Sequence, residues 1–378
     1  MRRFVMVLIA WAAVPLLAQV TEFEGRPAVV LSNGRVELTV TVSGATLANL
    51  VLLDDPDALS PFWNAARAVR LAGGQPGAPG GLGHFLCLDG FGAPSQEELK
   101  AGYPFHGEAG RMKFERVESA GDRNASSVTL TARLPLAQEQ ITRTVQLVDG
   151  EQVAYVQTEV ESLLSIDRPI SWAEHATLGP PFLEPGKVIV DMPAGRCRVR
   201  AEKPGPIPGR LAPLKDFEWP MAPLRKGGNV NLLSVPENEA ALDLATCAID
   251  PSRDYGYVAA LRRDRRLLFG YVFHRREYPW LMSWMNYTGD PQAARGIEFA
   301  TQPFDVSRRE TVDAHEMFGI PTYQWLPAKS KMRTRFLLFY TRVPEGFEDV
   351  ADVVLESGKL RIVSRSNKTL VLNASLGL

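Results

Sequence analysis

Apolar and polar residues alternate along most of the chain. The alternation is clear at residues 36–42, 127–134, 141–147 and 153–160. Successive side chains of a strand point to opposite faces, so this period of two predicts half-buried β-strands. Asp149-Gly150 lies between two of these runs and predicts a hairpin turn. Further strands are predicted at residues 187–191, 257–262, 267–273, 333–340, 359–363 and 369–373.

Helical periodicity is scarce. Residues 95–99 form a capping-box pattern that predicts one short helix, and apolar spacing predicts another at residues 347–357. Two stretches, 73–83 and 203–228, are rich in Gly and Pro, and each is either a functional rim or a surface insertion. Neither separates halves of different composition. We therefore predict one large antiparallel β domain over residues 19–378, of a size ordinary for sandwiches.

The first 18 residues are typical of a secretory signal peptide. Two arginines are followed by an apolar run over residues 4–17 and by Ala18 before a polar Gln19. The run is shorter than the roughly 20 residues that span a bilayer as a helix, although a retained anchor is the alternative interpretation. We expect cleavage after Ala18, a periplasmic or secreted protein, and no stable membrane span once the signal is removed.

Composition excludes several classes of function. The chain has 378 residues, 45% of them hydrophobic, with 42 Lys and Arg against 43 Asp and Glu. Such a chain can bury a core and is not disordered, and its balanced charge argues against a nucleic-acid partner. Three cysteines allow at most one disulfide and leave one thiol over. The sequence contains neither a Gly-rich phosphate loop nor a Gly-x-Ser-x-Gly elbow, and no spaced ligand set for a metal, so no cofactor is expected.

Candidate chemistry lies in three short segments. The segment at 103–110 carries His106 and Glu108 among turn residues, and the segment at 170–182 carries Glu174 and His175. If the latter is a strand, His175 shares a face with Ser171 and Ala173, whereas Trp172 and Glu174 point to the other face. In the third segment, at 295–304, Glu298 interrupts an apolar strand. A carboxylate in such a place either pairs with a cation or works in a site.

Together these blocks resemble the aldose 1-epimerase (galactose mutarotase-like) family. Residues 33–50, with Gly-Ala-Thr-Leu-Ala-Asn-Leu after a strand, resemble the family's opening. Residues 105–107 and 169–175 resemble its two His motifs, and 296–302 resembles the late strand with its catalytic Glu. The order and spacing match over about residues 31–343. The resemblance implies a large antiparallel β-supersandwich and a small sugar or oligosaccharide as ligand.

The resemblance also implies roles for residues. Glu298 would be the base that takes the proton of the anomeric hydroxyl, His175 the acid at the ring oxygen, and His106 a group that polarises that oxygen. Glu108 and Glu174 are sugar-binding candidates, and Trp63, Trp172 and Trp284 are candidates for stacking on a sugar, with core packing as the alternative for each. Aligning Thr301-Gln302 with the family's Glu-Thr-Gln places Ala300 at the base position, two residues from Glu298. We expect a separation of roughly 5 to 8 Å between the Glu298 carboxylate and the His175 ring, across an open cleft, if a pyranose lies between them.

Two functions stay open at this point. The first is a secreted sugar isomerase of the aldose 1-epimerase kind. The second is a non-catalytic carbohydrate-binding protein on the same fold, because fold alone does not decide between them. Polysaccharide-degrading enzymes on related folds usually carry a second, helical domain, and the sequence shows no sign of one.

Overall fold

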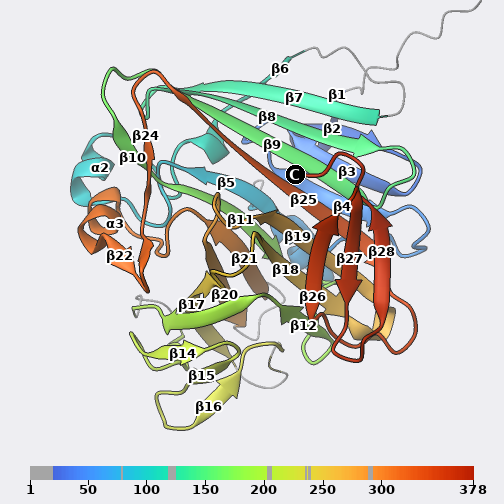
Figure 1. Cartoon of the computed structure of the whole chain (residues 1–378). Coiled ribbons are helices and arrows are strands. Elements are labelled where there is room, and N and C mark those ends of the chain that lie inside the picture. The colour runs from blue at the N-terminus through green and yellow to red at the C-terminus, as the bar shows by residue number, and fades with distance from the viewer. Residues whose placement is uncertain are drawn as a thin grey trace, which may run out of the picture.

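The computed structural model describes residues 20–77, 80–117, 125–201, 207–234, 236, 240–287 and 293–378. The predicted signal peptide lies outside the described residues, so its cleavage stays a prediction, as does the extent of a single domain. Strands dominate the described part of the chain (Figure 1). Across the described ranges, no helix combines the length and the apolar character that crossing a bilayer requires.

The larger of two main sheets carries His175 and Glu298. Its eleven strands pair antiparallel in the order β1-β2-β3-β4-β5-β11-β21-β20-β17-β13-β14. Their bounds are β1 Val20–Phe23, β2 Arg26–Ser32, β3 Val36–Thr41, β4 Leu47–Leu52, β5 His84–Leu88, β11 Trp172–Leu178, β13 Ala194–Val199, β14 Asp216–Glu218, β17 Ala241–Ile249, β20 Trp280–Tyr287 and β21 Ala294–Ala300.

The second main sheet has eight antiparallel strands in the order β12-β18-β19-β25-β9-β8-β7-β6. Their bounds are β6 Glu115–Val117, β7 Ala125–Leu134, β8 Glu139–Val148, β9 Val153–Ser162, β12 Val188–Asp191, β18 Tyr255–Arg262, β19 Leu267–His274 and β25 Lys331–Arg342. The predicted strands of this sheet are confirmed, and so is the hairpin at Asp149-Gly150, where Gly150 adopts a φ of 76°.

Smaller elements complete the fold. Three two-stranded sheets pair β10 with β24, β15 with β16, and β22 with β23, and β26, β27 and β28 form a three-stranded sheet. Their bounds are β10 Arg168–Ile170, β15 Met221–Pro223, β16 Asn229–Asn231, β22 Glu316–Met317, β23 Ile320–Pro321, β24 Gln324–Leu326, β26 Asp352–Glu356, β27 Lys359–Val363 and β28 Thr369–Asn373. The helices are α1 Ala65–Leu71, α2 Gln96–Lys100 and α3 Arg308–Ala314, with short 3₁₀ turns η1 Ala109–Arg111 and η2 Arg263–Arg265.

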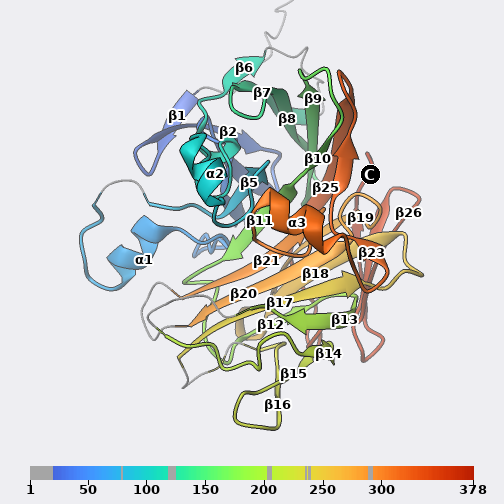
Figure 2. The same cartoon turned by 90° about the vertical axis from the view of Figure 1, so that its left-hand side faces the viewer.

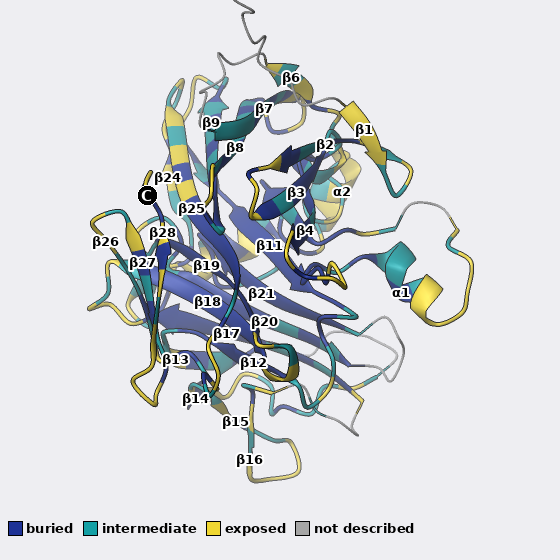
Figure 3. Cartoon of the chain, turned by 90° about the vertical axis from the view of Figure 1, so that its right-hand side faces the viewer, coloured by how far each residue is buried: buried dark blue, intermediate teal, exposed yellow. Residues whose placement is uncertain are grey.

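The sheets stack in three layers. The main core lies between the two large sheets and includes Leu38 and Phe299 from one and Ile141 and Phe336 from the other. A second core lies between the outer face of the eight-stranded sheet and β26–β28. Figure 3 shows the central strands β18–β21 as buried and β1 and the β16 region as largely exposed. The sheet β26–β28 thus covers one part of the outer face of the eight-stranded sheet, whereas β7, β8 and the start of β25 keep half-buried or exposed residues on that face. Loops and short helices lie over the outer face of the large sheet.

A buried charge network crosses the main core. Glu174 on β11 accepts two hydrogen bonds from Arg143 on β8, at 3.1 and 3.0 Å, and lies 2.7 Å from His84 on β5. Tyr278 and Trp172 also donate to Glu174. Burial by itself raises the pKa of Glu174, but Arg143 and His84 outweigh burial and lower that pKa to about 2. The carboxylate is therefore ionised and fully paired inside the protein.

One predicted helix is wrong. Residues 347–351 form no helix, and Asp352–Glu356 is strand β26, paired with β27. Phe347, Val350 and Val353 do face a core, as their spacing suggested. Ser357-Gly358, both with positive φ, makes a tight turn that gives the β-branched run a strand partner, and this pairing overrides the helical spacing. The helix predicted at 95–99 is confirmed as α2, with Ser95 and Glu98 forming the capping box.

The cysteines are distributed as one disulfide and one free thiol. Cys197 on β13 and Cys247 on β17 face each other in register and are bonded, whereas Cys87 is a buried free thiol. The sequence left the choice of pair open. The stretch 203–228 is not wholly irregular, because β14 and β15 lie within it.

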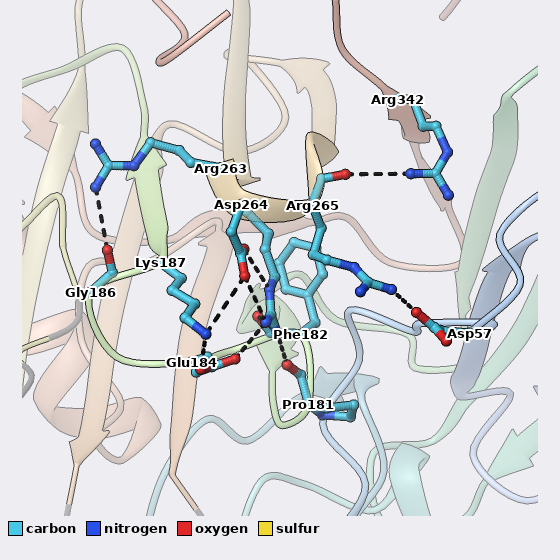
Figure 4. A network of polar contacts seen from close by, with 11 residues as sticks. Asp57, Pro181, Phe182, Glu184, Gly186, Lys187, Arg263, Asp264, Arg265 and Arg342 are labelled. Atoms are coloured by element: carbon cyan, nitrogen blue, oxygen red, sulfur yellow. Dashed lines mark hydrogen bonds and ion pairs between the residues drawn. The ribbon is translucent and has the colours of Figure 1, made fainter. Parts of the chain in front are cut away.

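The turn between β18 and β19 forms ion pairs and hydrogen bonds with neighbouring loops (Figure 4). Lys187 lies 3.7 Å from Asp264 of this turn, and Arg265 pairs with Asp57 on the other side. Exposed pairs of this kind contribute little stability each. Their effect is to hold the segment 181–187 and the loop at Asp57 against the end of the eight-stranded sheet.

The network predicts an asymmetric cost of mutation. Arg143→Met leaves the Glu174 charge buried with less compensation, so it should lower the free energy of unfolding by about 3–5 kcal/mol. The double variant Arg143→Met/Glu174→Leu removes both charges and should recover much of that loss. Urea unfolding followed by fluorescence measures both. A double variant as unstable as Arg143→Met would contradict the prediction.

Candidate functional site

The three predicted segments meet on the outer face of the large sheet. His175 on β11 is opposite Phe85 on β5, and Ala173 on β11 is opposite Ala300 on β21. The same antiparallel register places Glu298 across from His175, on the face turned away from the main core. The face prediction made from the alternation at 171–175 therefore agrees with the structure.

His175 and Glu298 are in contact. The Nε2 atom of His175 lies 3.5 Å from Oε1 of Glu298, and its Nδ1 atom lies 3.0 Å from Oγ1 of Thr177. His175 is 8% exposed and Glu298 3%. The expected 5 to 8 Å separation is wrong, because the two side chains lie side by side. A pyranose would have to lie over this pair instead of between its members.

His106 reaches the same place from a loop. Its backbone has a φ of 66°, in the left-handed region, and its ring centroid lies 5.0 Å from that of His175 with the rings nearly perpendicular. The backbone N–H of Gly92 donates to Nδ1 of His106 at 3.1 Å. A protonated imidazole has no acceptor nitrogen, so this hydrogen bond requires a neutral His106 with its hydrogen on Nε2.

Aromatic rings form the walls around the two histidines. Phe85 stacks on His175 with centroids 4.3 Å apart and planes 19° apart, and Phe91 lies 5.7 Å from His106. Trp284 on β20, half-buried, lies 6.1 Å from His175. Trp284 therefore lies beside His175 on the same face of the sheet, and its contact with a sugar stays a prediction. Apolar ring faces beside polar groups are typical of sites that bind amphipathic ligands.

Trp63 lies at the far end of β11. A Cβ atom at Gly179 or Gly81 would come within 2.6 or 2.4 Å of Trp63, so both positions need the absence of a side chain. The backbone N–H of Trp63 donates to the carbonyl of Thr177 at 2.9 Å. Trp63 therefore lies beside Thr177, two positions from His175 on β11, and its contact with a sugar stays a prediction.

Three of the predicted sugar-binding residues are placed elsewhere. Glu174 and Trp172 have no exposed surface and point into the main core, where Glu174 joins the network with Arg143. Glu108 accepts hydrogen bonds from the backbone N–H groups of Leu136 and Ala137, at 3.0 and 2.8 Å. These three predictions are wrong for this conformation: the strand alternation turns the first two inward, and Glu108 fixes a loop.

Sequence reasoning missed several neighbours of Glu298. Arg200, at the end of β13, pairs with Asp305 and lies 3.7 Å from the sulfur of Met282, which is opposite Glu298. Burial lowers the pKa of Arg200 to about 10, although the charge of Glu298 acts in the opposite direction. Nothing in the local pattern marks Arg200, because three arginines alternate along β13 and two of them pair with Asp216 at the surface.

Two excursions of the chain cover this face. One follows β5 and carries α2, and the other follows β21 and carries α3. Figure 2 shows both helices near β5, β11 and β21, on the face of the sheet that is turned to the viewer. Arg308 joins them, since its backbone N–H donates to Glu98 at 3.1 Å and its guanidinium lies 3.4 Å from Asp89. In the described part of the chain, no three His, Cys, Asp or Glu side chains are grouped to hold a metal ion.

Comparison with solved structures identifies the architecture. No protein-family model matches the sequence, and a search of curated proteins found no match. A galactose mutarotase-like protein from Clostridium acetobutylicum superposes with a TM-score of 0.58 at 12% identity, covering 86% of this chain and 98% of that one. This chain has the galactose mutarotase-like fold.

Two further structures agree with that fold. A provisionally assigned aldose 1-epimerase from Klebsiella pneumoniae subsp. pneumoniae gives a TM-score of 0.55 at 12% identity, covering 85% of this chain and 82% of that one. A galactose mutarotase-like protein from Lactobacillus casei gives 0.53 at 15% identity, covering 83% and 100%. At such identities the likeness shows the fold alone, and it confirms the expected β-supersandwich.

Ala300 occupies the position that the resemblance gives to the base. It is fully buried and packs with Cys87, Phe91, Ala173 and Met282 in a small apolar cluster. This position in the galactose mutarotase-like fold therefore offers no proton acceptor here. Glu298, on the same face, is the carboxylate beside the histidines.

Burial determines the charge of His175. Removal from water lowers its pKa to about 3, a larger effect than the backbone hydrogen bond that favours the charged form. His175 is therefore neutral near pH 7. At neutral pH it can donate a hydrogen bond but does not act as an imidazolium acid.

The lowered pKa makes stability depend on pH. In the unfolded chain His175 takes up a proton as the pH falls below about 6.5, whereas in the folded protein it does so only near 3. The unfolded state binds more protons in this window, so stability should fall as the pH drops from about 6.5 towards 3. Denaturant midpoints across this range measure the slope. His175→Gln should flatten it, and an unchanged slope in that variant would contradict the assignment.

Proposed function

We propose that this protein binds a free sugar on the outer face of the large sheet and interconverts its anomers, as an aldose 1-epimerase does. The observation that carries the proposal is the convergence of Glu298, His175 and His106 on one aromatic-walled face. A carboxylate and two imidazoles are the groups that acid–base exchange at an anomeric centre needs. The fold shared with aldose 1-epimerase-like structures supports the same choice without deciding it.

The chemistry begins at the anomeric hydroxyl. Glu298 takes the hydroxyl proton, a carbonyl forms at C1, and the bond between C1 and the ring oxygen breaks. Negative charge then develops on the ring oxygen, and the proton that Glu298 has taken passes to this oxygen to complete the open-chain aldehyde. Rotation of the aldehyde and the reverse sequence close the ring as the other anomer. The net change on ring opening is one proton moved from the anomeric hydroxyl to the ring oxygen.

The histidines would act as neutral donors. His106 carries its hydrogen on Nε2, and His175 is neutral near pH 7. In a water-poor site, a neutral imidazole N–H can stabilise the developing negative charge by a hydrogen bond, and the imidazole does not need to be protonated for this. The acid role that the resemblance implied for His175 is thus replaced by hydrogen bonding to the ring oxygen or to Glu298.

A second candidate is a sugar-binding protein without turnover. It is favoured by Ala300 at the implied base position and by the contact of Glu298 with His175, which leaves Glu298 3% exposed. A base held in this way must be uncovered before it can act. Trp284 and Phe85 would still provide apolar surface for a sugar ring.

Glu298→Gln separates these two functions. The amide keeps the size of the carboxylate but does not accept a proton, so the mutarotation rate should fall by roughly 10²- to 10⁴-fold while sugar affinity changes little. Polarimetry on freshly dissolved glucose and galactose measures the rate, and calorimetric titration measures the affinity. Glu277 is a partly buried carboxylate that accepts a hydrogen bond from the backbone N–H of Arg335. The variant Glu277→Gln is therefore a control for the loss of a negative charge.

The outcomes are distinct. A wild-type protein that binds a sugar but adds nothing to its spontaneous mutarotation would exclude the isomerase and leave the binding protein. A protein that binds no sugar would exclude both functions. If the wild type accelerates mutarotation and Glu298→Gln does so at the same rate, another group is the base.

We also propose that the protein is exported to the periplasm or the exterior. The first 18 residues have the order of a signal peptide, and a disulfide such as Cys197–Cys247 is typical of oxidising compartments. Mass spectrometry of the protein from its native host should give an N-terminus at or near Gln19. An intact Met1 in a soluble cytoplasmic fraction would contradict export.

A further inference from the structure

Thr177 holds the ring of His175 from the side opposite to Glu298. The two residues are two positions apart on β11 and so share a face. Oγ1 of Thr177 lies 3.0 Å from Nδ1 of His175, while Nε2 lies 3.5 Å from Oε1 of Glu298. Phe85 stacks on the ring and limits its rotation. Among the side chains, each ring nitrogen therefore has one defined oxygen partner.

Electrostatics decides which nitrogen carries the hydrogen. With the hydrogen on Nδ1, the lone pair of Nε2 would face the carboxylate oxygen of Glu298, and two negative regions would oppose each other. With the hydrogen on Nε2, the N–H points towards the carboxylate, and the Thr177 hydroxyl donates to Nδ1. Thr177 and Glu298 are each only 3% exposed, so water screens this difference weakly.

We infer that Thr177 is a positioning residue that fixes His175 in the tautomer with hydrogen on Nε2. The hydroxyl is the donor that makes Nδ1 an acceptor. At His106 the backbone N–H of Gly92 has the same effect on Nδ1. Two unrelated donors, one on a strand and one in a loop, thus set both histidines to the same tautomer.

The consequence for catalysis rests on the proposed function. Both imidazoles carry the hydrogen on Nε2, and the one on His175 orients the Glu298 carboxylate. Loss of the Thr177 hydroxyl would leave Nδ1 without a donor, and the backbone hydrogen bond that favours a protonated His175 ring would then compete with Glu298 for the ring hydrogen. The base would then lose a hydrogen bond that fixes its position, and the histidine would lose its role as donor.

The test compares Thr177→Val, which keeps the shape and removes the hydroxyl, with Thr177→Ser, which keeps the hydroxyl. Nitrogen-15 NMR of histidine-labelled protein distinguishes the tautomers through the shifts and long-range couplings of the two ring nitrogens. The chain has five histidines, and the spectrum of His175→Gln identifies the signal of His175. Thr39→Val, at another buried threonine of the same sheet, controls for the loss of a hydroxyl as such.

We expect hydrogen on Nε2 in wild type, Thr177→Ser and Thr39→Val, and a mixed or reversed tautomer in Thr177→Val. Hydrogen on Nδ1 in wild type, or an unchanged spectrum in folded Thr177→Val, would overturn the inference. Thermal unfolding shows whether each variant is folded. If Thr177→Val does not fold, the wild-type and Thr177→Ser spectra still decide the tautomer.

Activity gives a second measurement. Thr177→Val should lower the mutarotation rate by between about 10- and 10⁴-fold, the upper figure being the cost of a wrong histidine tautomer in a serine protease, and Thr177→Ser should restore most of it. The two proposals fail separately. If the tautomer is as inferred but the wild type has no turnover, only the isomerase function is excluded. If the wild type turns over sugar but Thr177→Val leaves the tautomer unchanged, only the positioning role of Thr177 is excluded.

Discussion

The ion pair between Arg143 and Glu174 constrains the whole sandwich. It joins β8 of one sheet to β11 of the other, and His84 extends it to β5. A buried carboxylate is tolerated only where its charge is compensated, so these strands must keep their spacing. His175 is the next residue after Glu174, and the strand alternation turns it to the opposite face. The position of the candidate site is therefore set from the inner side of the sheet by a network that is itself buried.

The outer face depends on small residues as much as on charged ones. A Cβ atom at Gly296 would lie 2.2 Å from Oε1 of Glu298, so the carboxylate in its present position uses the space that a side chain at Gly296 would fill. Ala173 and Ala300 leave similar room beside the histidines. A sheet face that is otherwise aromatic thus accommodates one carboxylate close to the backbone. This arrangement explains why a lone Glu is tolerated in the apolar strand β21.

Local sequence pattern predicted the strands and the side of β11 on which His175 lies, because alternation reports directly which face is buried. It also predicted α2 from Ser95 and Glu98. It could not show that Arg143 lies opposite Glu174 or that Arg200 lies beside Met282, since these contacts join distant strands. Residues 347–357 show the same limit, because their helical spacing and their strand pairing both bury Val353, and only the turn at Ser357-Gly358 distinguishes the two. The resemblance supplied the fold; the contact between Glu298 and His175 depended on side-chain packing.

The placement of β25 has a consequence for the order in which the protein assembles. This strand lies between β9 and β19, and Arg333 contacts Glu159 across 174 residues of sequence. Until β25 has been synthesised, β9 and β19 each present an unpaired edge, and the eight-stranded sheet exists only as two separate parts. Pairings between such distant segments are slow to form, and open edges favour association between chains. The strands on each side of β25 can therefore pair during synthesis, but the centre of the sheet closes only after both of its flanks.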